Sequence, residues 1–215
     1  MEALGQPFRQ TGLCVGQVDA RDADLGESEL PGPRTNPSHE LSIDRSHRPI
    51  VEIASRTLHW QGEEDTARFA QSLALAMQAR PELGHAFIAL HGDLGAGKTT
   101  FVRHLLRALG VQGRIKSPTY AVVEPHTTQD GRPAYHFDFY RFSDPREWED
   151  AGFRDLFAGP GLKLAEWPGQ AAGYLPTEDL AIHIEAMTPD ADDMRRVQLR
   201  AFTPNGQALL AAVAP

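Results

Sequence analysis

Several features that define whole classes of proteins are missing from this sequence. Cys14 is the single cysteine, which excludes an internal disulfide framework and a cysteine-based metal cluster. No stretch approaches the roughly 20 apolar residues of a membrane span. Met1 is followed by Glu2 and not by an apolar segment, so we expect no secretory signal, no membrane partner and a cytoplasmic location.

Positive charge is also in short supply. Lysines and arginines number 21 against 29 aspartates and glutamates, which leaves a net charge of -8. This balance disfavours broad, nonspecific binding of nucleic acid, but it leaves open a local basic patch or a role in RNA metabolism through protein partners. With 215 residues and no internal repeats, the chain is long enough for one α/β domain and some additional sequence.

The first part of the chain, residues 1–48, differs in composition from the rest. Glycine, proline, serine, aspartate and arginine dominate it, apolar periodicity is missing, and Pro31-Gly32-Pro33 and Asn36-Pro37 interrupt it. We predict a disordered N-terminal extension here and a folded domain over residues 49–215. The alternative is that translation starts further downstream.

The most informative stretch reads Gly-Asp-Leu-Gly-Ala-Gly-Lys-Thr at residues 92–99 and satisfies the phosphate-loop pattern G-x-x-x-x-G-K-[ST] at every position. Its glycines let backbone N–H groups converge into an anion nest, and a following helix would direct its positive dipole end there. Lys98 adds a mobile positive charge for the outer phosphates, and the Thr99 hydroxyl can ligate Mg²⁺.

The context favours a nucleotide site over an ordinary glycine-rich turn. A short apolar run over residues 86–90 predicts a buried strand before the loop. Apolar residues at helical spacing over 100–109 predict a helix after it, and Gly110 stands where that helix would end. Strand, loop and helix thus follow in the order that a nucleotide site needs.

Periodicity and turn residues predict the remaining elements. A helix over residues 63–80 would bury Phe69, Leu73, Ala76 and Met77, and a short helix would start at Asp144-Pro145 and reach Asp150. The predicted strands cover residues 53–60, 120–124, 134–139, 161–166, 180–185 and 197–202. Asn205-Gly206 is interpreted as a turn into a last strand over 209–213.

Two acids are candidates for phosphate chemistry. Glu166 ends a mostly apolar predicted strand, where it can contact Mg²⁺ directly or through water, although it can equally be a solvated strand-end acid. Asp138 alternates with Phe137 and Phe139, and an acid among aromatic side chains is costly to bury without a partner. It can position water or sit near the metal, or it can be a structural carboxylate that pairs with Arg141 or caps the backbone.

Three further positions have both a functional and a structural interpretation. Ser117-Pro118-Thr119 can place a hydroxyl near the γ-phosphate, as switch segments do, or be a plain proline turn. Trp167, with Pro168, can flank a nucleotide pocket or simply pack. His136, which shares a strand face with Asp138, fits a core or supporting role better than a catalytic one.

Missing signatures narrow the enzyme class. The sequence has no Asn-Lys-x-Asp pattern for reading guanine, which disfavours a GTPase, and it has no obvious arginine-rich lid of the kind that many small kinases use. Arg141, Arg146 and Arg154 nevertheless fall in one region, which keeps a small-molecule kinase as the alternative function. A nucleotide-sensing module without useful catalysis is a third hypothesis.

Four blocks of residues together carry a family resemblance. They are Gly-Asp-Leu-Gly-Ala-Gly-Lys-Thr-Thr at 92–100, Lys-Ser-Pro-Thr-Tyr at 116–120, His-Phe-Asp-Phe-Tyr-Arg at 136–141 and Glu-Trp-Pro at 166–168. In this order and at this spacing they closely resemble the TsaE family, formerly called YjeE, the bacterial ATPases of tRNA threonylcarbamoyladenosine (t6A) synthesis. The similarity covers about residues 53–213, and the N-terminal extension has no counterpart in the usual family pattern.

The resemblance implies a compact α/β domain, a P-loop NTPase-like three-layer sandwich with a mostly parallel central sheet flanked by helices. It implies binding of ATP with Mg²⁺ and slow hydrolysis by the chain alone. It also implies work with TsaB and TsaD, which transfer threonylcarbamoyl to adenosine 37 of tRNAs that read ANN codons. The ATPase would reset that complex between turnovers without making the threonylcarbamoyl bond, and it would meet tRNA only through the complex.

The same resemblance assigns roles to individual residues. The phosphates would be held by Gly95, Ala96, Gly97, Lys98, Thr99 and Thr100. Magnesium would be held by Thr99 and Glu166. Asp138 would be needed for hydrolysis, with Lys98 and Thr119 contributing near the γ-phosphate. Glu63 and either Arg195 or Arg196 would line the nucleoside end, with Trp167 beside the pocket.

Overall fold

The structure is a computed structural model that describes residues 51–187 and 193–213. The extension predicted over residues 1–48 lies outside the described residues. Within them, one seven-stranded sheet has the strand order β1-β7-β6-β2-β5-β4-β3. Its strands are β1 (Ala54–Trp60), β2 (Phe87–His91), β3 (Val123–Thr127), β4 (Pro133–Asp138), β5 (Leu162–Glu166), β6 (Leu180–Ala186) and β7 (Arg195–Ala201). The helices are α1 (Glu63–Ala79), α2 (Lys98–Ala108), α3 (Glu147–Asp150), α4 (Phe153–Ala158) and α5 (Pro204–Ala212), with short 3-10 helices η1 (Pro81–His85) and η2 (Pro168–Ala171).

The centre of the sheet is parallel. The neighbours β6, β2, β5 and β4 all pair in parallel, whereas β7 and β3 run antiparallel to the strands beside them. Because β1 opposes β7, it points the same way as the four central strands. The α/β fold with a mostly parallel sheet is therefore confirmed, and the carboxyl ends of β2, β4 and β5 meet at one edge, where such sheets bind ligands.

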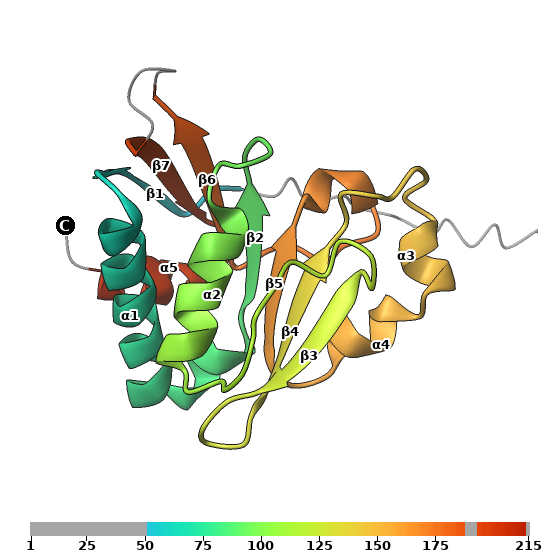
Figure 1. Cartoon of the computed structure of the whole chain (residues 1–215). Coiled ribbons are helices and arrows are strands. Elements are labelled where there is room, and N and C mark those ends of the chain that lie inside the picture. The colour runs from blue at the N-terminus through green and yellow to red at the C-terminus, as the bar shows by residue number, and fades with distance from the viewer. Residues whose placement is uncertain (1–50, 188–192, 214–215) are drawn as a thin grey trace, which may run out of the picture. The chain divides into compact units, whose positions relative to one another are not determined.

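Helices cover both faces of this sheet (Figure 1). On one face α1, α2 and α5 bury a large aliphatic core that includes Leu73, Leu105 and Leu209. On the other face α3 and α4 cover an aromatic cluster around Phe137 and Phe153, whose rings meet edge to face with centroids 5.4 Å apart. These three layers match the predicted sandwich and bury the central strands on both faces.

The early elements follow the predicted pattern closely. The first predicted strand and helix correspond to β1 and α1, and Phe69, Leu73 and Met77 are buried on α1 as expected, while Ala76 is half-buried. In the described part of the chain, no helix is both long enough and apolar enough to cross a membrane.

The prediction of a last strand over residues 209–213 is wrong, because this stretch belongs to helix α5 and its end. Thr203 caps that helix, its side-chain oxygen accepting a hydrogen bond from the Gly206 amide at 3.1 Å, and Pro204 occupies the first turn. Leu209, Leu210 and Val213 are all buried. Their spacing fits one face of a helix better than the alternation of a strand.

The prediction of a strand over residues 120–124 is wrong in its first half, because β3 begins only at Val123. Tyr120 is 87% exposed, and the Val122 amide donates to the Pro118 carbonyl oxygen at 2.6 Å, which closes a turn. Val122 has a φ of 65°, which is rare for a β-branched residue. Helix α4 was not predicted at all.

Candidate nucleotide-binding site

The glycine-rich loop joins the end of β2 to the start of α2, as the sequence predicts. Gly92 opens it with a φ of 134°, and a Cβ there would lie 2.2 Å from the Ile184 carbonyl oxygen on β6. Only glycine therefore fits between the loop and the sheet. This packing brings the loop over the parallel strands and directs the N-terminus of α2, with its unpaired amides, to the same point.

Lys98 is buried within the loop that it belongs to. Its Nζ donates hydrogen bonds to the carbonyl oxygens of Gly92 at 2.7 Å and Asp93 at 2.8 Å, and it lies 4.0 Å from the centroid of the Trp167 ring. Burial lowers the pKa of this ammonium group, and the nearby carboxylates of Glu166, Asp138 and Asp93 counteract that shift. The ammonium group is thus held beside the loop by two of the loop's own carbonyl oxygens.

A threonine and an acid from distant parts of the chain meet beside this lysine. The Thr99 hydroxyl donates to Glu166 Oε1 at 2.8 Å, and the buried His136 ring places Nε2 at 2.9 Å from the same oxygen. Glu166 is 3% exposed at the end of β5. Hydroxyl and carboxylate oxygens are the ligands that Mg²⁺ prefers, so this pair fits a magnesium ion chemically.

Asp138 ends β4 opposite Glu166 in the strand register and is also 3% exposed. Its Oδ2 accepts hydrogen bonds from the hydroxyls of Ser117 and of Thr119, the latter at 2.7 Å, and its Oδ1 accepts one from the Tyr140 amide at 3.0 Å. Of the two structural alternatives for Asp138, the pairing with Arg141 is not found, whereas the hydrogen bond from the Tyr140 amide is a backbone cap. The Arg141 guanidinium instead lies 4.2 Å from the centroid of the Tyr120 ring.

One pocket of about 280 Å³ brings most of the predicted residues together. Its lining includes Gly95, Gly97, Lys98, Thr99, Thr100, Thr119, Asp138, Glu166 and Trp167, all of which were predicted. Leu94, Ser117 and Tyr140 complete the lining. The small volume and the polar residues around it suit a phosphate chain better than a large apolar ligand.

Three predicted residues stand outside this lining. Ala96 is buried in the loop, and its carbonyl oxygen accepts a hydrogen bond from Arg195 Nε at 3.2 Å, so Arg195 contacts the loop from β7. Glu63 begins α1 and its Oε1 lies 2.8 Å from Nε2 of His104 on α2. The nucleoside roles of Glu63 and Arg195 stay predictions. Arg196, the alternative to Arg195, forms an ion pair with Glu185 on β6.

Sequence reasoning gave little weight to two side chains that the structure places in the site. Ser117 binds Asp138 together with Thr119, although only Thr119 was singled out. Tyr140 lines the pocket, and its ring centroid lies 5.0 Å from that of Trp167. The spacing Ser-x-Thr in a turn was the available signal for Ser117, whereas no pattern in the sequence indicates the direction of Tyr140.

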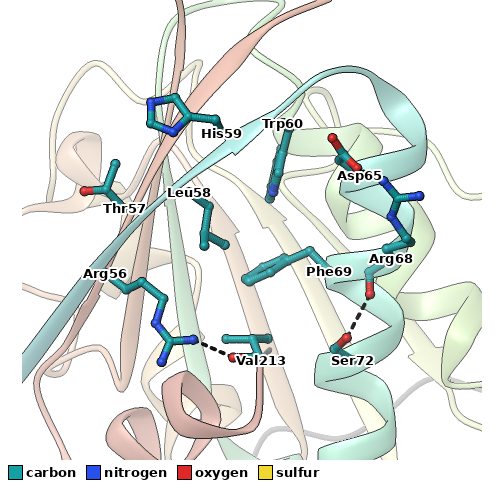
Figure 2. A pocket seen from close by; sticks show the side chains of 10 residues that line it. All are labelled: Arg56, Thr57, Leu58, His59, Trp60, Asp65, Arg68, Phe69, Ser72 and Val213. Atoms are coloured by element: carbon teal, nitrogen blue, oxygen red, sulfur yellow. Dashed lines mark hydrogen bonds and ion pairs between the residues drawn. The ribbon is translucent and has the colours of Figure 1, made fainter. Parts of the chain in front are cut away.

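A second and larger pocket, of about 680 Å³, lies between β1 and α1 (Figure 2). Its apolar floor is formed by Leu58, Trp60 and Phe69. Several of its polar groups already have partners, because Arg68 pairs with Asp65 and the Arg56 guanidinium donates to the Val213 carbonyl oxygen. None of the predicted site residues lines this pocket.

The fold and the loop between β2 and α2 define this protein as a member of the P-loop NTPase-like class. A solved structure supports that class: the crystal structure of Bacillus subtilis YdiB matches with a TM-score of 0.57 and 27% sequence identity, over 74% of this chain and 93% of that one.

Comparisons at the level of sequence are more specific. Residues 60–197 match the family described as threonylcarbamoyl adenosine biosynthesis protein TsaE. The tRNA threonylcarbamoyladenosine biosynthesis protein TsaE of Haemophilus influenzae is 42% identical over 74% of this chain and 98% of its own length. Its namesake from Bacillus subtilis is 39% identical over 53% of this chain and 68% of its own length. The chain belongs to the TsaE family.

Proposed function

We propose that this chain is the Mg²⁺-dependent ATPase subunit of t6A synthesis at position 37 of tRNA, and that it acts in the cytoplasm with TsaB and TsaD. The observation that carries the proposal is the convergence of Lys98, Thr99, Glu166 and Asp138 on one pocket in a chain of the TsaE family. Its relatives are named as t6A biosynthesis proteins, which supports the assignment to this pathway.

Binding of ATP would rest on the loop and on Lys98. The loop amides and the N-terminus of α2 would receive the phosphate oxygens, and Lys98 would turn from the Gly92 and Asp93 carbonyl oxygens toward the outer phosphates. Among the described residues, no group of three His, Cys, Asp or Glu side chains could hold a metal ion by itself. Magnesium would therefore depend on Thr99 and Glu166 together with phosphate oxygens, and it would neutralise charge on the transferred group.

Hydrolysis would rest on Asp138. Its carboxylate lines the pocket, and the hydroxyls of Ser117 and Thr119 hold it in place, so it can orient a water molecule and accept its proton. Phosphoryl transfer to water needs positioning and charge neutralisation more than covalent help. We expect slow turnover by the chain alone and faster turnover where partners complete the site.

Reconstitution tests this proposal. The chain, TsaB, TsaD, tRNA and a threonylcarbamoyl donor are combined with and without ATP, and the t6A formed per TsaD is measured. Repeated turnovers should require both the chain and ATP, and Lys98→Ala should abolish them, whereas Arg107→Ala, on the exposed side of the same helix, should not. Repeated turnovers that do not depend on this chain would contradict the assignment to the pathway.

The same preparation separates the alternatives. A small-molecule kinase, which the exposed arginines Arg146 and Arg154 keep open, would form ADP only when an acceptor molecule is supplied. A nucleotide-sensing module would bind ATP and form no ADP even with TsaB and TsaD present. Basal ADP formation without any acceptor, increased by the partner proteins, is the result that the proposed function requires.

A further inference from the structure

His136 is a fully buried polar residue whose role the proposed mechanism leaves open. It lies on β4, and its Nε2 is 2.9 Å from Glu166 Oε1 at the end of β5. The side chain of His136 is 0% exposed and that of Glu166 is 3% exposed. The same carboxylate oxygen accepts the hydrogen bond of the Thr99 hydroxyl at 2.8 Å. His136 therefore contacts the proposed magnesium carboxylate without lining the pocket itself.

The protons of the imidazole can be assigned from its contacts. An ionised carboxylate only accepts hydrogen bonds, so Nε2 must carry the hydrogen in the contact with Glu166. Nδ1 is buried and finds no hydrogen-bond partner among the described residues. A hydrogen on Nδ1 would be a buried donor without a partner, which costs free energy. These contacts place a hydrogen on Nε2, where it meets the carboxylate.

The two hydrogen bonds act on one side of the carboxylate. Both Thr99 and His136 bind Oε1, and no described residue donates a hydrogen bond to Oε2. Glu166 is thus held by one oxygen while the other keeps its full capacity to accept. An imidazole with one unsatisfied nitrogen is a poor choice for core packing alone, because an apolar side chain of similar volume would avoid that cost.

We propose that His136 is a positioning residue: its Nε2–H group orients Glu166 so that the carboxylate can bind the magnesium ion of the nucleotide complex. The inference rests on the proposed function and deepens it by naming the group that sets the geometry of the acid. Partners of this kind, hydrogen-bonded to a metal ligand, typically change metal affinity by about 10- to 100-fold when removed.

Two variants separate orientation from packing. His136→Leu keeps an apolar group of similar volume and removes the donor, whereas His136→Gln keeps an N–H group at the reach of Nε2. ATP binding is measured by calorimetry across a series of Mg²⁺ concentrations and again in excess chelator. His136→Leu should raise the Mg²⁺ concentration for half-maximal enhancement of binding about 10-fold, and His136→Gln should restore most of it. Affinity in chelator should stay within about 2-fold of wild type for both variants.

Several results would overturn the proposal. A Mg²⁺ requirement of His136→Leu equal to that of wild type would do so, and so would an equal loss of affinity with and without Mg²⁺, which is the sign of a packing defect. ATP binding by wild type that does not depend on Mg²⁺ would instead contradict the proposed function together with this inference. A dependence on Mg²⁺ in wild type that both variants retain would remove the inference alone.

A measurement on the unmodified protein covers the case in which the leucine variant does not fold. Long-range proton–nitrogen correlation spectra of ¹⁵N-histidine-labelled protein report which ring nitrogen carries hydrogen. For His136 we expect hydrogen on Nε2 and a bare Nδ1, with the Nε2–H signal shifting when Mg²⁺ and ATP are added together but not when ATP is added with chelator. Hydrogen on Nδ1, or a signal insensitive to Mg²⁺, would overturn the proposal.

Discussion

Asp138 owes its position to three donors that come from two different segments. Its Oδ2 receives the hydroxyls of Ser117 and Thr119, and its Oδ1 receives the Tyr140 amide. Such contacts hold the carboxylate in one orientation, which the proposed role as a base for water activation requires. A backbone hydrogen bond also ties the turn before β3 to the end of β4: the Asp138 amide donates to the Val122 carbonyl oxygen at 2.9 Å.

The variant Asp138→Asn tests the catalytic role of this carboxylate. It preserves the shape of the side chain and removes the charge, so ATP should still bind, while hydrolysis should fall by about 100-fold or more. Calorimetry and the rate of phosphate release measure the two quantities. Glu149→Gln, which alters an exposed acid on α3, is the matched control and should leave both unchanged. Normal hydrolysis by Asp138→Asn would contradict the assignment.

At the scale of the element, α5 depends on a close approach between Gly206 and the backbone of Asp179, which no local sequence pattern indicates. A Cβ on Gly206 would lie 1.7 Å from the Asp179 carbonyl oxygen, which belongs to the backbone just before β6. Asp179 also accepts hydrogen bonds from the Phe87 amide at 2.7 Å and from the Thr203 hydroxyl. Through these contacts Asp179 joins the start of α5 to the amino ends of β2 and β6.

Gly206→Ala should therefore destabilise the protein, although alanine favours helix formation by up to about 1 kcal/mol relative to glycine. The overlap with backbone leaves no flexible neighbour to move, so we expect a net loss of about 1–3 kcal/mol in the free energy of unfolding. Urea denaturation measures it. Gly169→Ala, in η2, is the control, because a Cβ there meets nothing within 4 Å. A Gly206→Ala protein as stable as wild type would show that this approach is not as close as described.

At the scale of the whole molecule, a pair of histidines links the parallel strands just below the glycine-rich loop. His91 ends β2 and stacks on His183 of β6, with ring centroids 4.2 Å apart and ring planes 5° from parallel. Burial lowers the pKa of His91 to about 4, with His183, Arg200 and Lys98 adding smaller effects of the same sign. Burial and Arg200 also lower the pKa of His183.

This pair makes global stability fall in acid. Between its ordinary pKa of about 6.5 and the folded value of about 4, His91 takes up a proton more readily in the unfolded chain, so the free energy of unfolding decreases as the pH falls through that window. Allowing for solvent around the half-buried ring, the loss due to His91 is about 2 kcal/mol. Urea titrations at pH 7 and pH 4.5 measure it.

The substitution His91→Gln should reduce the decrease in the free energy of unfolding between pH 7 and pH 4.5, because the glutamine cannot titrate. His59→Gln, at an exposed position of β1, is the control and should show the same pH dependence of the free energy of unfolding as wild type. Equal pH dependence of wild type and His91→Gln would exclude His91 as its source.

Local signals explain which elements could be predicted. The glycine-rich loop, α1, α2 and the buried strands β2 and β5 each carry their pattern within a few consecutive residues, so their prediction needed no knowledge of the partner elements. The prediction for the end of the chain was wrong because Asn205-Gly206 resembles a turn. Thr203-Pro204, two residues earlier, is the stronger signal and marks a helix start.

The sequence by itself determined the fold class and the glycine-rich loop, because the loop and the helix start behind it are built from neighbouring residues. Only the tertiary structure decided where the two acids lie relative to each other and to the loop. The parallel pairing of β4 with β5 sets Asp138 opposite Glu166, and the return of α2 over the sheet brings Thr99 to Glu166. Residues 67 positions apart in the chain meet there through strand register and helix packing, which no local pattern encodes.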